Sequence, residues 1–459
     1  MAGFQLVAAL GDVASIGPTG NKLERRALYR LRRCHRALSP RPRRTSGRAA
    51  LLHLAGFMAI AASISPARAD PLTFEEALAR TQANAPSLQA KALGADASRA
   101  TRQAAGALPD PKLSIGIDSF PISGPLAFKP SRDDFTWIRV GVSQDIPNPA
   151  KRRAQRSRAD ADIAVAIADA GLEARTVEAD TAVAWITLAY AQKRLAVLDA
   201  VRAGLARLVR TTPSAVASGN ARPGQTLAGK QALSDLDDRR DELVAAIGRA
   251  RAELMRWTGD SAPEIEGPVP DFVVDAPSLR TALNSNPLLA PADARLSQAD
   301  ADVRLAEADR RPDFGVEATY QHRDPRFGDY ISAGVTIGLP MFNRRRQGAL
   351  IAARLAEVGK VGAEREAARR ALAANLEAGL ADHAMHHDQW VRSRETVEPL
   401  ARDRVDLETA SYAAGRASLV DVVDAHIALV EAALLTLDRE ALVGIDGARL
   451  TLIYRSATR

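Results

Sequence analysis

The sequence contains two copies of one pattern, and no other feature limits so strongly how the chain can fold. Four short motifs return in the same order, the first two 201 residues later and the third 193 residues later. The pairs are Asn84–Leu88 with Ser285–Leu289, Pro111–Ile115 with Pro312–Val316, Val140–Pro147 with Ala333–Pro340, and Lys151–Arg153 with Arg344–Arg346. A constant order with drifting offsets is typical of duplication followed by changes in loop length. We therefore predict a first repeat over 70–261, a Pro-rich linker over 262–277 and a second repeat over 278–459.

Each copy is predicted to hold two strands, because apolar and polar residues alternate over stretches of suitable length. The run Phe314–Gln321 shows this, with Phe, Val, Ala and Tyr on one side and Gly, Glu, Thr and Gln on the other. The predicted strands cover about 111–119, 135–146, 312–321 and 329–340.

Strands of about 9–11 residues with one apolar and one polar face fit a transmembrane barrel with a wet lumen. A half-exposed hairpin of a soluble protein would show the same alternation. Aromatic residues near the strand ends would form an interfacial girdle; these are Phe120, Phe135, Trp137, Tyr320 and Tyr330. Four strands cannot close a barrel, and an open sheet edge is not viable in lipid. If the strands span a membrane, several chains must contribute to one barrel.

Two long helical runs are predicted over 152–210 and 349–411. They contain a single proline, Pro399, which indicates a kink or a break in the second run. At about 1.5 Å per residue each run would reach on the order of 90 Å, far longer than a helix of a globular domain. Leucine and valine recur at intervals of seven residues in the first run, as in coiled coils. The chain is therefore predicted to be mainly α with a small β part.

The net charge of +7 is concentrated at the N-terminus. Residues 1–69 contain 12 of the 62 basic residues but only 2 of the 55 acidic ones, so the remainder is slightly acidic. The high isoelectric point is therefore no indication of nucleic-acid binding.

The same segment, 1–69, resembles an export signal with an over-extended N-terminus. Arginines precede the apolar run Ala49–Ile64, and Ala67-Arg68-Ala69 fits the small-residue cleavage pattern, so we expect cleavage before Asp70. The only cysteine, Cys34, lies upstream of that point, which leaves the mature chain without a disulfide or an acylated cysteine.

The stretch Tyr412–Asp424 joins the second long run to a returning helix. Gly415 suits a helix end, Ser418 is a good N-cap, and Asp421 falls in the favourable first turn. Asp421 and Asp424 are spaced i,i+3, so both carboxylates project from one face at the tip of a hairpin. Taken alone, this is a capped turn with solvated acids.

Three motifs together make the chain resemble the TolC family of outer-membrane efflux channels over about 70–457. They are Leu72-Thr73…Ala77-Leu78…Asn84…Pro86, then Gly338-Leu339-Pro340…Asn343-Arg344…Gln347-Gly348, and finally Tyr412…Gly415…Ser418…Asp421-Val422…Asp424-Ala425. The resemblance implies a homotrimer in which each chain gives four strands to a twelve-stranded barrel in the outer membrane of a Gram-negative bacterium. The helices would continue this barrel as a periplasmic α-helical tunnel.

The resemblance also implies roles for particular segments. The loops 119–134 and 322–329 would face outside, and the turns 211–224 and 412–420 would form the periplasmic tip. Asp421 and Asp424 would form acidic rings that narrow the entrance, and such crowding should raise some of their pKa values. Tyr412, Gly415 and Arg416 complete this predicted gate, although Ala417 stands where some members place a latching arginine. The first-copy tip has no acid matching Asp421.

Pro109–Pro111 and Ser143–Arg152 look most like the heavy-metal branch of the family (CzcC/CusC-type). His383, His386 and His387 lie on the second long run, and the i,i+4 pair of His383 with His387 could hold a metal. A solvated helix face explains the three histidines better than a metal site does, because no third acidic or thiolate ligand is fixed by the spacing.

The predicted function is therefore the outer-membrane component of a tripartite efflux system, with heavy-metal cations as substrates. Its partners would be a periplasmic adaptor (membrane fusion) protein, an inner-membrane RND-type pump and outer-membrane lipid. Drug efflux or type I protein secretion by the same fold is an alternative, and a soluble periplasmic helical-hairpin adaptor is another. An exported enzyme is disfavoured, since no nucleophile elbow, phosphate loop or HExxH motif is present, and nothing calls for a cofactor.

Overall fold

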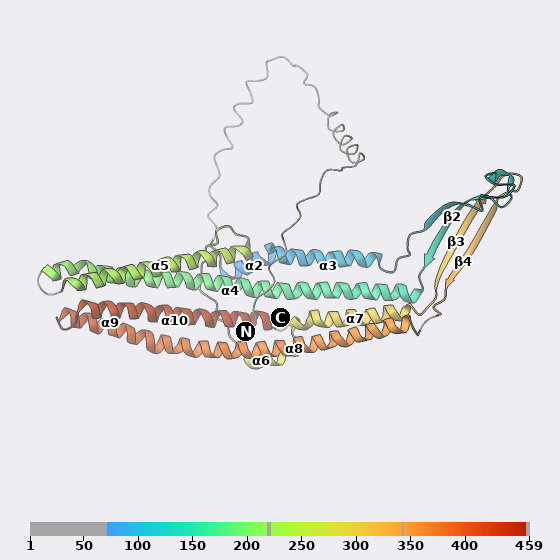
Figure 1. The fold of residues 1–459 in the computed structure, drawn as a ribbon. Helices are drawn as coiled ribbons and strands as arrows, with labels where there is room; N and C mark the ends of the chain where they lie inside the picture. The colour runs from blue at the N-terminus through green and yellow to red at the C-terminus, as the bar shows by residue number, and fades with distance from the viewer. Residues whose placement is uncertain (1–70, 218–221, 342–343, 456–459) are drawn as a thin grey trace, which may run out of the picture. The chain divides into compact units, whose positions relative to one another are not determined.

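Two long helical hairpins and one four-stranded sheet make up the chain over residues 71–217, 222–341 and 344–455, the part that the computed structural model describes (Figure 1). These residues belong to a single compact unit. The predicted signal segment, 1–69, lies outside the described residues.

The elements follow one order in both halves. The first half contains α2 (Phe74–Asn84), α3 (Pro86–Ala104), β1 (Lys112–Asp118), β2 (Trp137–Ile146), α4 (Pro149–Ala217) and α5 (Pro223–Thr258). The second contains α6 (Ala276–Ala282), two short 3₁₀ turns, α7 (Ala290–Ala308), β3 (Asp313–His322), β4 (Tyr330–Gly338), α8 (Gln347–Arg392), a π-helical turn (Ser393–Val397), α9 (Glu398–Ala413) and α10 (Leu419–Tyr454).

The four strands form one antiparallel sheet in the order β1-β2-β3-β4. The two expected strand pairs are thus joined by β2 and β3, which places Val140 opposite Tyr320 across the boundary between the copies. The register aligns the apolar positions of neighbouring strands, because cross-strand partners lie on one face of a sheet. That face carries Leu113, Ile115, Ile117, Ile138, Val140, Val142, Phe314, Val316, Tyr320, Ile331, Val335 and Ile337, and every one of these side chains is exposed.

The opposite face of the sheet is polar, and its side chains are crowded. Gly141 lies between neighbouring strands so tightly that a Cβ would come within 2.6 Å of Thr319 and 2.8 Å of Ser114. A Cβ on Gly334 would come within 2.8 Å of the Glu317 carboxylate. Glycine at these two positions leaves room for polar side chains on the more crowded face.

Helix α4 is continuous for 69 residues, which corresponds to a length of about 100 Å. It packs along α5 and α10 over one part of its length and along α3 and α7 over another, and Figure 1 shows α5 and α3 following one another beside it. The second long run, predicted as one helix over 349–411, is divided into α8, the π-helical turn and α9. Pro399 explains the interruption, because it lacks an N–H and its ring clashes with the carbonyl of Glu395 in a regular α-helix.

The centre of the helical region is organised by Trp185 of α4, which is completely buried. Its indole N–H donates to the Leu72 carbonyl at 3.1 Å, and Phe74 packs edge-on against its ring at 5.6 Å. The backbone of Leu72 also pairs with Glu264 and Glu266, so the start of α2 and the predicted linker 262–277 are held together. Further along this linker, Phe272 packs on Gly447 of α10. The linker therefore connects the start of α2 with α10 at this level of the bundle.

Among the described helices, each is too short or too polar to cross a lipid bilayer.

Candidate functional site

The turn between α9 and α10 is closed by hydrogen bonds at both of its ends. Gly415 has φ +68°, the left-handed conformation that favours glycine, and its N–H donates to the Tyr412 carbonyl at 3.0 Å. Ser418 caps α10: its hydroxyl accepts the Asp421 N–H at 3.3 Å, and the Asp421 carboxylate accepts the Ser418 N–H at 2.8 Å. The reciprocal capping box fixes the Asp421 carboxylate at the hairpin tip.

Asp421 and Asp424 are both exposed and lie on one side of the first turns of α10. Hydrogen bonds from the Ser418 hydroxyl and backbone N–H lower the pKa of Asp421, and the nearby charge of Arg404 acts in the same direction. Within one chain the pKa of Asp421 is therefore lowered, whereas crowding at the entrance was expected to raise it. That rise requires the acids of neighbouring copies, so it stays a prediction for the assembly.

Tyr412 is half-buried and packs against the cluster of buried residues that includes Leu419 and Val423. It therefore holds the turn against the hairpin. Arg416 is exposed at the turn. The structure brings the five predicted gate residues into one tip, and their part in gating stays a prediction.

The tip of the first copy is built differently. Residues 218–221 of the predicted turn 211–224 lie outside the described residues. On its far side α5 begins at Pro223, and the Arg222 N–H donates to the Gln225 side-chain oxygen at 3.0 Å. An amide here takes the capping role that a carboxylate has in the second copy.

The three histidines do not converge on one point. The His386 ring nitrogen Nδ1 is 2.7 Å from the Asp446 carboxylate of α10, whereas the His387 ring packs edge-on against Trp390 at 5.7 Å. Burial lowers the pKa of His383. Among the described residues, no group of three or more His, Cys, Asp or Glu side chains could hold a metal ion. His383 and His387 both line a hollow of about 580 Å³, together with Glu440, whereas His386 faces Asp446. A metal site at these histidines stays a prediction.

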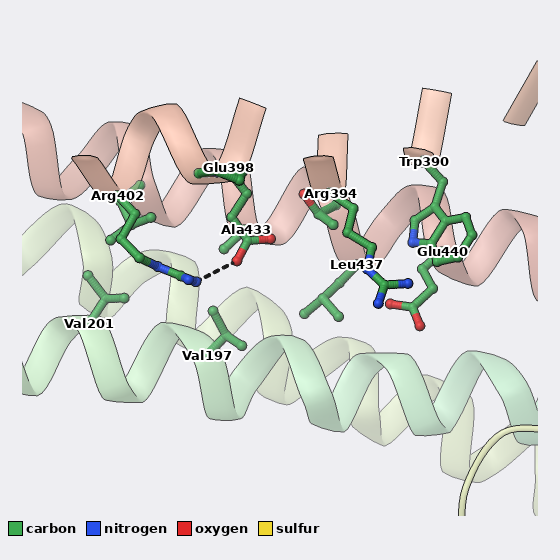
Figure 2. Close-up of a pocket in the computed structure, with 12 residues that line it drawn as sticks. Val197, Val201, Trp390, Arg394, Glu398, Arg402, Ala433, Leu437 and Glu440 are labelled. Carbon is green, nitrogen blue, oxygen red and sulfur yellow. Dashed lines mark hydrogen bonds and ion pairs between the residues drawn. The ribbon is translucent and has the colours of Figure 1, made fainter. Parts of the chain in front are cut away.

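A groove of about 560 Å³ separates the two hairpins beside the π-helical turn. Figure 2 shows its apolar floor, with Val197 and Val201 on α4, and its charged rim. In that rim Arg402 pairs with Glu398 at 2.9 Å, and the Arg394 guanidinium lies over the Trp390 ring at 5.3 Å from its centre. The lining contains no histidine, serine or cysteine.

The π-helical turn has a specific partner that the sequence did not reveal. Arg439 of α10 donates one guanidinium N–H to the Gln389 carbonyl at 3.3 Å and to the hydroxyl of Ser393. Ser393 is completely buried, and the wider π turn leaves room for this contact. Pro399 was the visible signal of a break, but the arginine that supports it lies 46 residues from Ser393.

Comparison with known proteins finds similar outer-membrane efflux proteins. Residues 278–453 match the family model described as outer membrane efflux protein. The chain is 24% identical to the cobalt-zinc-cadmium resistance protein CzcC of Cupriavidus metallidurans over 371 residues. The aligned region covers 79% of this chain and 85% of that protein. Residues 278–453, most of the second repeat, are therefore similar to outer membrane efflux proteins.

Solved structures of low sequence identity have the same fold. A membrane protein from Pseudomonas aeruginosa superposes with a TM-score of 0.72 at 15% identity, over 83% of this chain and 90% of that one. The channel protein CusC gives a TM-score of 0.71 at 12% identity, over 84% and 92% of the two chains. The predicted fold, long helices with a small sheet in a TolC-like arrangement, is confirmed.

The match to this family model and the likeness to CzcC indicate the outer membrane of a Gram-negative bacterium as the location. The prediction of an outer-membrane efflux protein, made from three motifs and a duplication, is likewise confirmed. The family match covers the second repeat and includes the tip with Asp421 and Asp424.

Proposed function

We propose that three copies of this chain form the outer-membrane channel of a tripartite efflux system and conduct heavy-metal cations to the exterior. The sheet would contribute to a transmembrane barrel, and the helical hairpins would continue the conduit through the periplasm. The observation that carries this proposal is the continuous apolar face of the sheet.

That face is directed away from every described helix and is open to solvent, with Ile115, Ile331 and Val335 at least 70% exposed. Apolar patches of this extent are unfavourable in water, at about 25 cal/mol for each Å². Against lipid tails the same face is stable. Strand β3 has 10 residues and spans about 33 Å along its axis, enough to cross the apolar band of an outer membrane when tilted.

Closure of the barrel supports an oligomer. Strands β1 and β4 are the outer strands of the sheet, and each leaves one edge without a partner inside the described chain. Unpaired backbone groups are not tolerated in hydrocarbon, so β1 of one copy must pair with β4 of the next. Three copies give twelve strands, and a closed ring of identical contacts is the usual form of such an assembly.

Helix α9 supports the same conclusion from the other end of the chain. It buries no side chain, and Leu400 and Leu407 are 62% and 69% exposed. In a trimer these leucines would pack on the neighbouring copy. The acids of α10 would then converge on the axis, six carboxylates in all, and rings of acidic side chains favour cations in pores.

The metal substrate rests on the likeness to a cobalt-zinc-cadmium resistance protein and on the Pro109–Pro111 and Ser143–Arg152 segments. The three histidines are not needed for it. An adaptor protein and an RND-type pump would deliver the cations, and we expect no catalysis, because the matching family model describes efflux proteins.

Deletion of the gene tests the substrate. We expect growth to fail on cobalt, zinc or cadmium salts while growth on dyes and detergents is unchanged. Sensitivity to dyes and detergents alone would assign the channel to drug efflux, and loss of an exported protein would assign it to type I secretion. Recovery of the protein as a soluble periplasmic monomer would exclude the channel and favour an adaptor.

Planar-bilayer recording tests the gate. Asp421→Ala combined with Asp424→Ala should increase conductance and reduce cation preference, because the ring of negative charge is removed. Asp421→Asn with Asp424→Asn is the matched control for size, since it removes charge while amide oxygens can still accept the Ser418 N–H. Currents identical to those of the unmodified channel would remove both acids from the gate.

A further inference from the structure

Six exposed arginines gather where the strands join the helices. Arg310 and Arg311 precede β3, Arg344, Arg345 and Arg346 precede α8, and Arg153 lies in the first turn of α4. We call these six residues the arginine belt. Within the described chain, none of the six side chains makes a hydrogen bond or an ion pair. Arg153 and Arg311 line one hollow of about 300 Å³ between α4 and α7, together with Arg304 and a single carboxylate, Glu307.

This lack of partners is particular to the junction. Further along the same helices arginines are paired across elements, as in Arg158 with Asp302 at 2.5 Å and Arg295 with Asp169 at 2.9 Å. At the junction Lys151 engages the acids instead, with Asp309 at 2.9 Å and Asp313 at 3.5 Å. The belt is thus left with uncompensated positive charge.

Local helix stability does not account for Arg153 or for Arg344–Arg346. Helices α4 and α8 begin here, and neither has an acidic residue in its first turn. Positive side chains at a helix N-terminus oppose the helix dipole and are unfavourable. A cost of this kind, present in both copies of the repeat, indicates that the arginines bind something outside the chain.

The belt directly continues the apolar face of the sheet. Leu339 and Met341 extend the apolar positions of β4 and are 64% and 77% exposed. Arg344 follows Met341 by three residues, so their Cα atoms are at most about 11 Å apart. Arg311 precedes Phe314 of the apolar face by the same interval. If the apolar face lies in hydrocarbon, these arginines lie at the depth of the lipid headgroups.

We propose that the arginine belt binds the phosphate groups of anionic phospholipids in the periplasmic leaflet of the outer membrane. This inference depends on the membrane placement of the sheet in the proposed function. Arginine suits this ligand because its planar guanidinium forms two parallel hydrogen bonds to one phosphate. Clusters of basic residues beside a membrane-embedded segment attract anionic lipids in the same way. Five of the six arginines belong to the second repeat, so each copy would hold lipid where β3 and β4 join α7 and α8.

Native mass spectrometry of the detergent-solubilised assembly, titrated with phosphatidylglycerol or phosphatidylethanolamine, measures this binding. The unmodified protein should retain phosphatidylglycerol preferentially. Replacing Arg344–Arg346 by glutamine should weaken its retention about tenfold, while phosphatidylethanolamine is unaffected. Replacing the three by lysine should restore only part of the affinity. Lysine keeps the positive charge but cannot form two parallel hydrogen bonds to one phosphate.

The matched control replaces Arg207, Arg210 and Arg251 by glutamine. These arginines are also exposed, but they lie on α4 and α5 away from the strands, so the loss of charge is equal and lipid retention should not change. Equal retention of phosphatidylglycerol by the belt variant and this control would overturn the proposal. So would a belt variant with unchanged lipid retention and altered ion selectivity, which would place the arginines in the lumen.

Conductance measured in a planar bilayer distinguishes a failure of the lipid proposal from a failure of the proposed channel function. Unmodified protein that forms no pores would contradict the proposed function, whatever lipid it binds. Pores that form normally in a protein with no preference for phosphatidylglycerol would contradict the lipid proposal alone.

Discussion

The two long helical runs come from matching positions of the duplicated unit, yet only the first is a continuous helix. Helix α4 extends from Pro149 to Ala217 and completely buries Leu198 and Leu205 in the half nearer the tip. Its counterpart is divided by the π-helical turn at Ser393–Val397, and the distal piece, α9, buries nothing. The two copies therefore share the order of their elements, but only the first contains a long helix without a π-helical interruption.

This difference coincides with a difference in charge. The tip that follows the interrupted run carries Asp421 and Asp424, and the tip that follows α4 has no matching acid. The hairpin of the second copy therefore combines an acidic tip with a break in its helix. The start of α10 is packed, with Leu419 and Val422 completely buried, so we infer that α4 with α5 is the fixed hairpin and that α9 is the part that can move.

The largest expected effect tests the packing of the fixed hairpin. Leu205→Ala should reduce the free energy of unfolding by about 2–5 kcal/mol, since a fully buried leucine leaves a cavity. Leu407→Ala on α9 is the matched control and should change it by less than about 0.5 kcal/mol in the isolated chain. Chemical denaturation followed by circular dichroism measures both. Equal losses would mean that the two hairpins are packed alike.

The next effect concerns the support of the break. Arg439→Met should destabilise the π-helical turn by about 1–3 kcal/mol, because the buried Ser393 hydroxyl and the Gln389 carbonyl lose their cationic donor. Hydrogen exchange should become faster in 389–413 and stay unchanged in α4. Arg449→Met, at an exposed position of the same helix, is the control. Uniform exchange in the Arg439 variant would show that the break needs no support.

A smaller effect tests the tip itself. Ser418→Ala removes the hydroxyl that accepts the Asp421 N–H and should destabilise the start of α10 by about 1 kcal/mol. Ser418→Thr should retain most of the stability. Hydrogen exchange of the first turn of α10 is the measurement, and protection unaffected by the loss of the hydroxyl would mean that the cap is not needed there.

The smallest effect is a dependence on acid. Hydrogen bonds from Ser418 hold the pKa of Asp421 below its unfolded value of about 3.9. The carboxylate therefore stabilises the folded tip fully above that value, and this contribution is lost as the pH falls through the lower, folded-state pKa. Hydrogen exchange at the start of α10 should rise below about pH 4, and Asp421→Asn should abolish the dependence. A pH profile shared by both proteins would assign the effect to another group.

Much of this arrangement could be predicted from residue patterns. Alternation located the strands, and Gly415 with Ser418 located the turn. The absence of proline over 152–210 located most of α4, which continues through Pro213 to Ala217. These features are local, so neighbouring residues determine them. The pairing of β2 with β3 was missed because it depends on the two repeats folding against each other, and no motif within either repeat records that contact.

The candidate site was less predictable for the same reason. Helical spacing suggested that His383 and His387 could share a metal, but their surroundings come from other elements, such as Asp446 beside His386. Crowding suggested a raised pKa for the tip acids, whereas the cap lowers that of Asp421 in the single chain. Side-chain partners from distant elements decide such properties, and sequence spacing does not identify them.

The two outer strands of the sheet have a genetic consequence. In the proposed trimer, β1 of every copy must pair with β4 of a neighbour. One copy with a defective strand edge therefore prevents closure of the barrel. A proline in the middle of β1, which removes a backbone donor, would therefore act dominantly. With equal expression of both alleles and random mixing, roughly one trimer in eight would contain only intact copies. A plasmid that carries the proline variant could then make a resistant cell sensitive to the exported substrate, even though the chromosomal gene of that cell is intact.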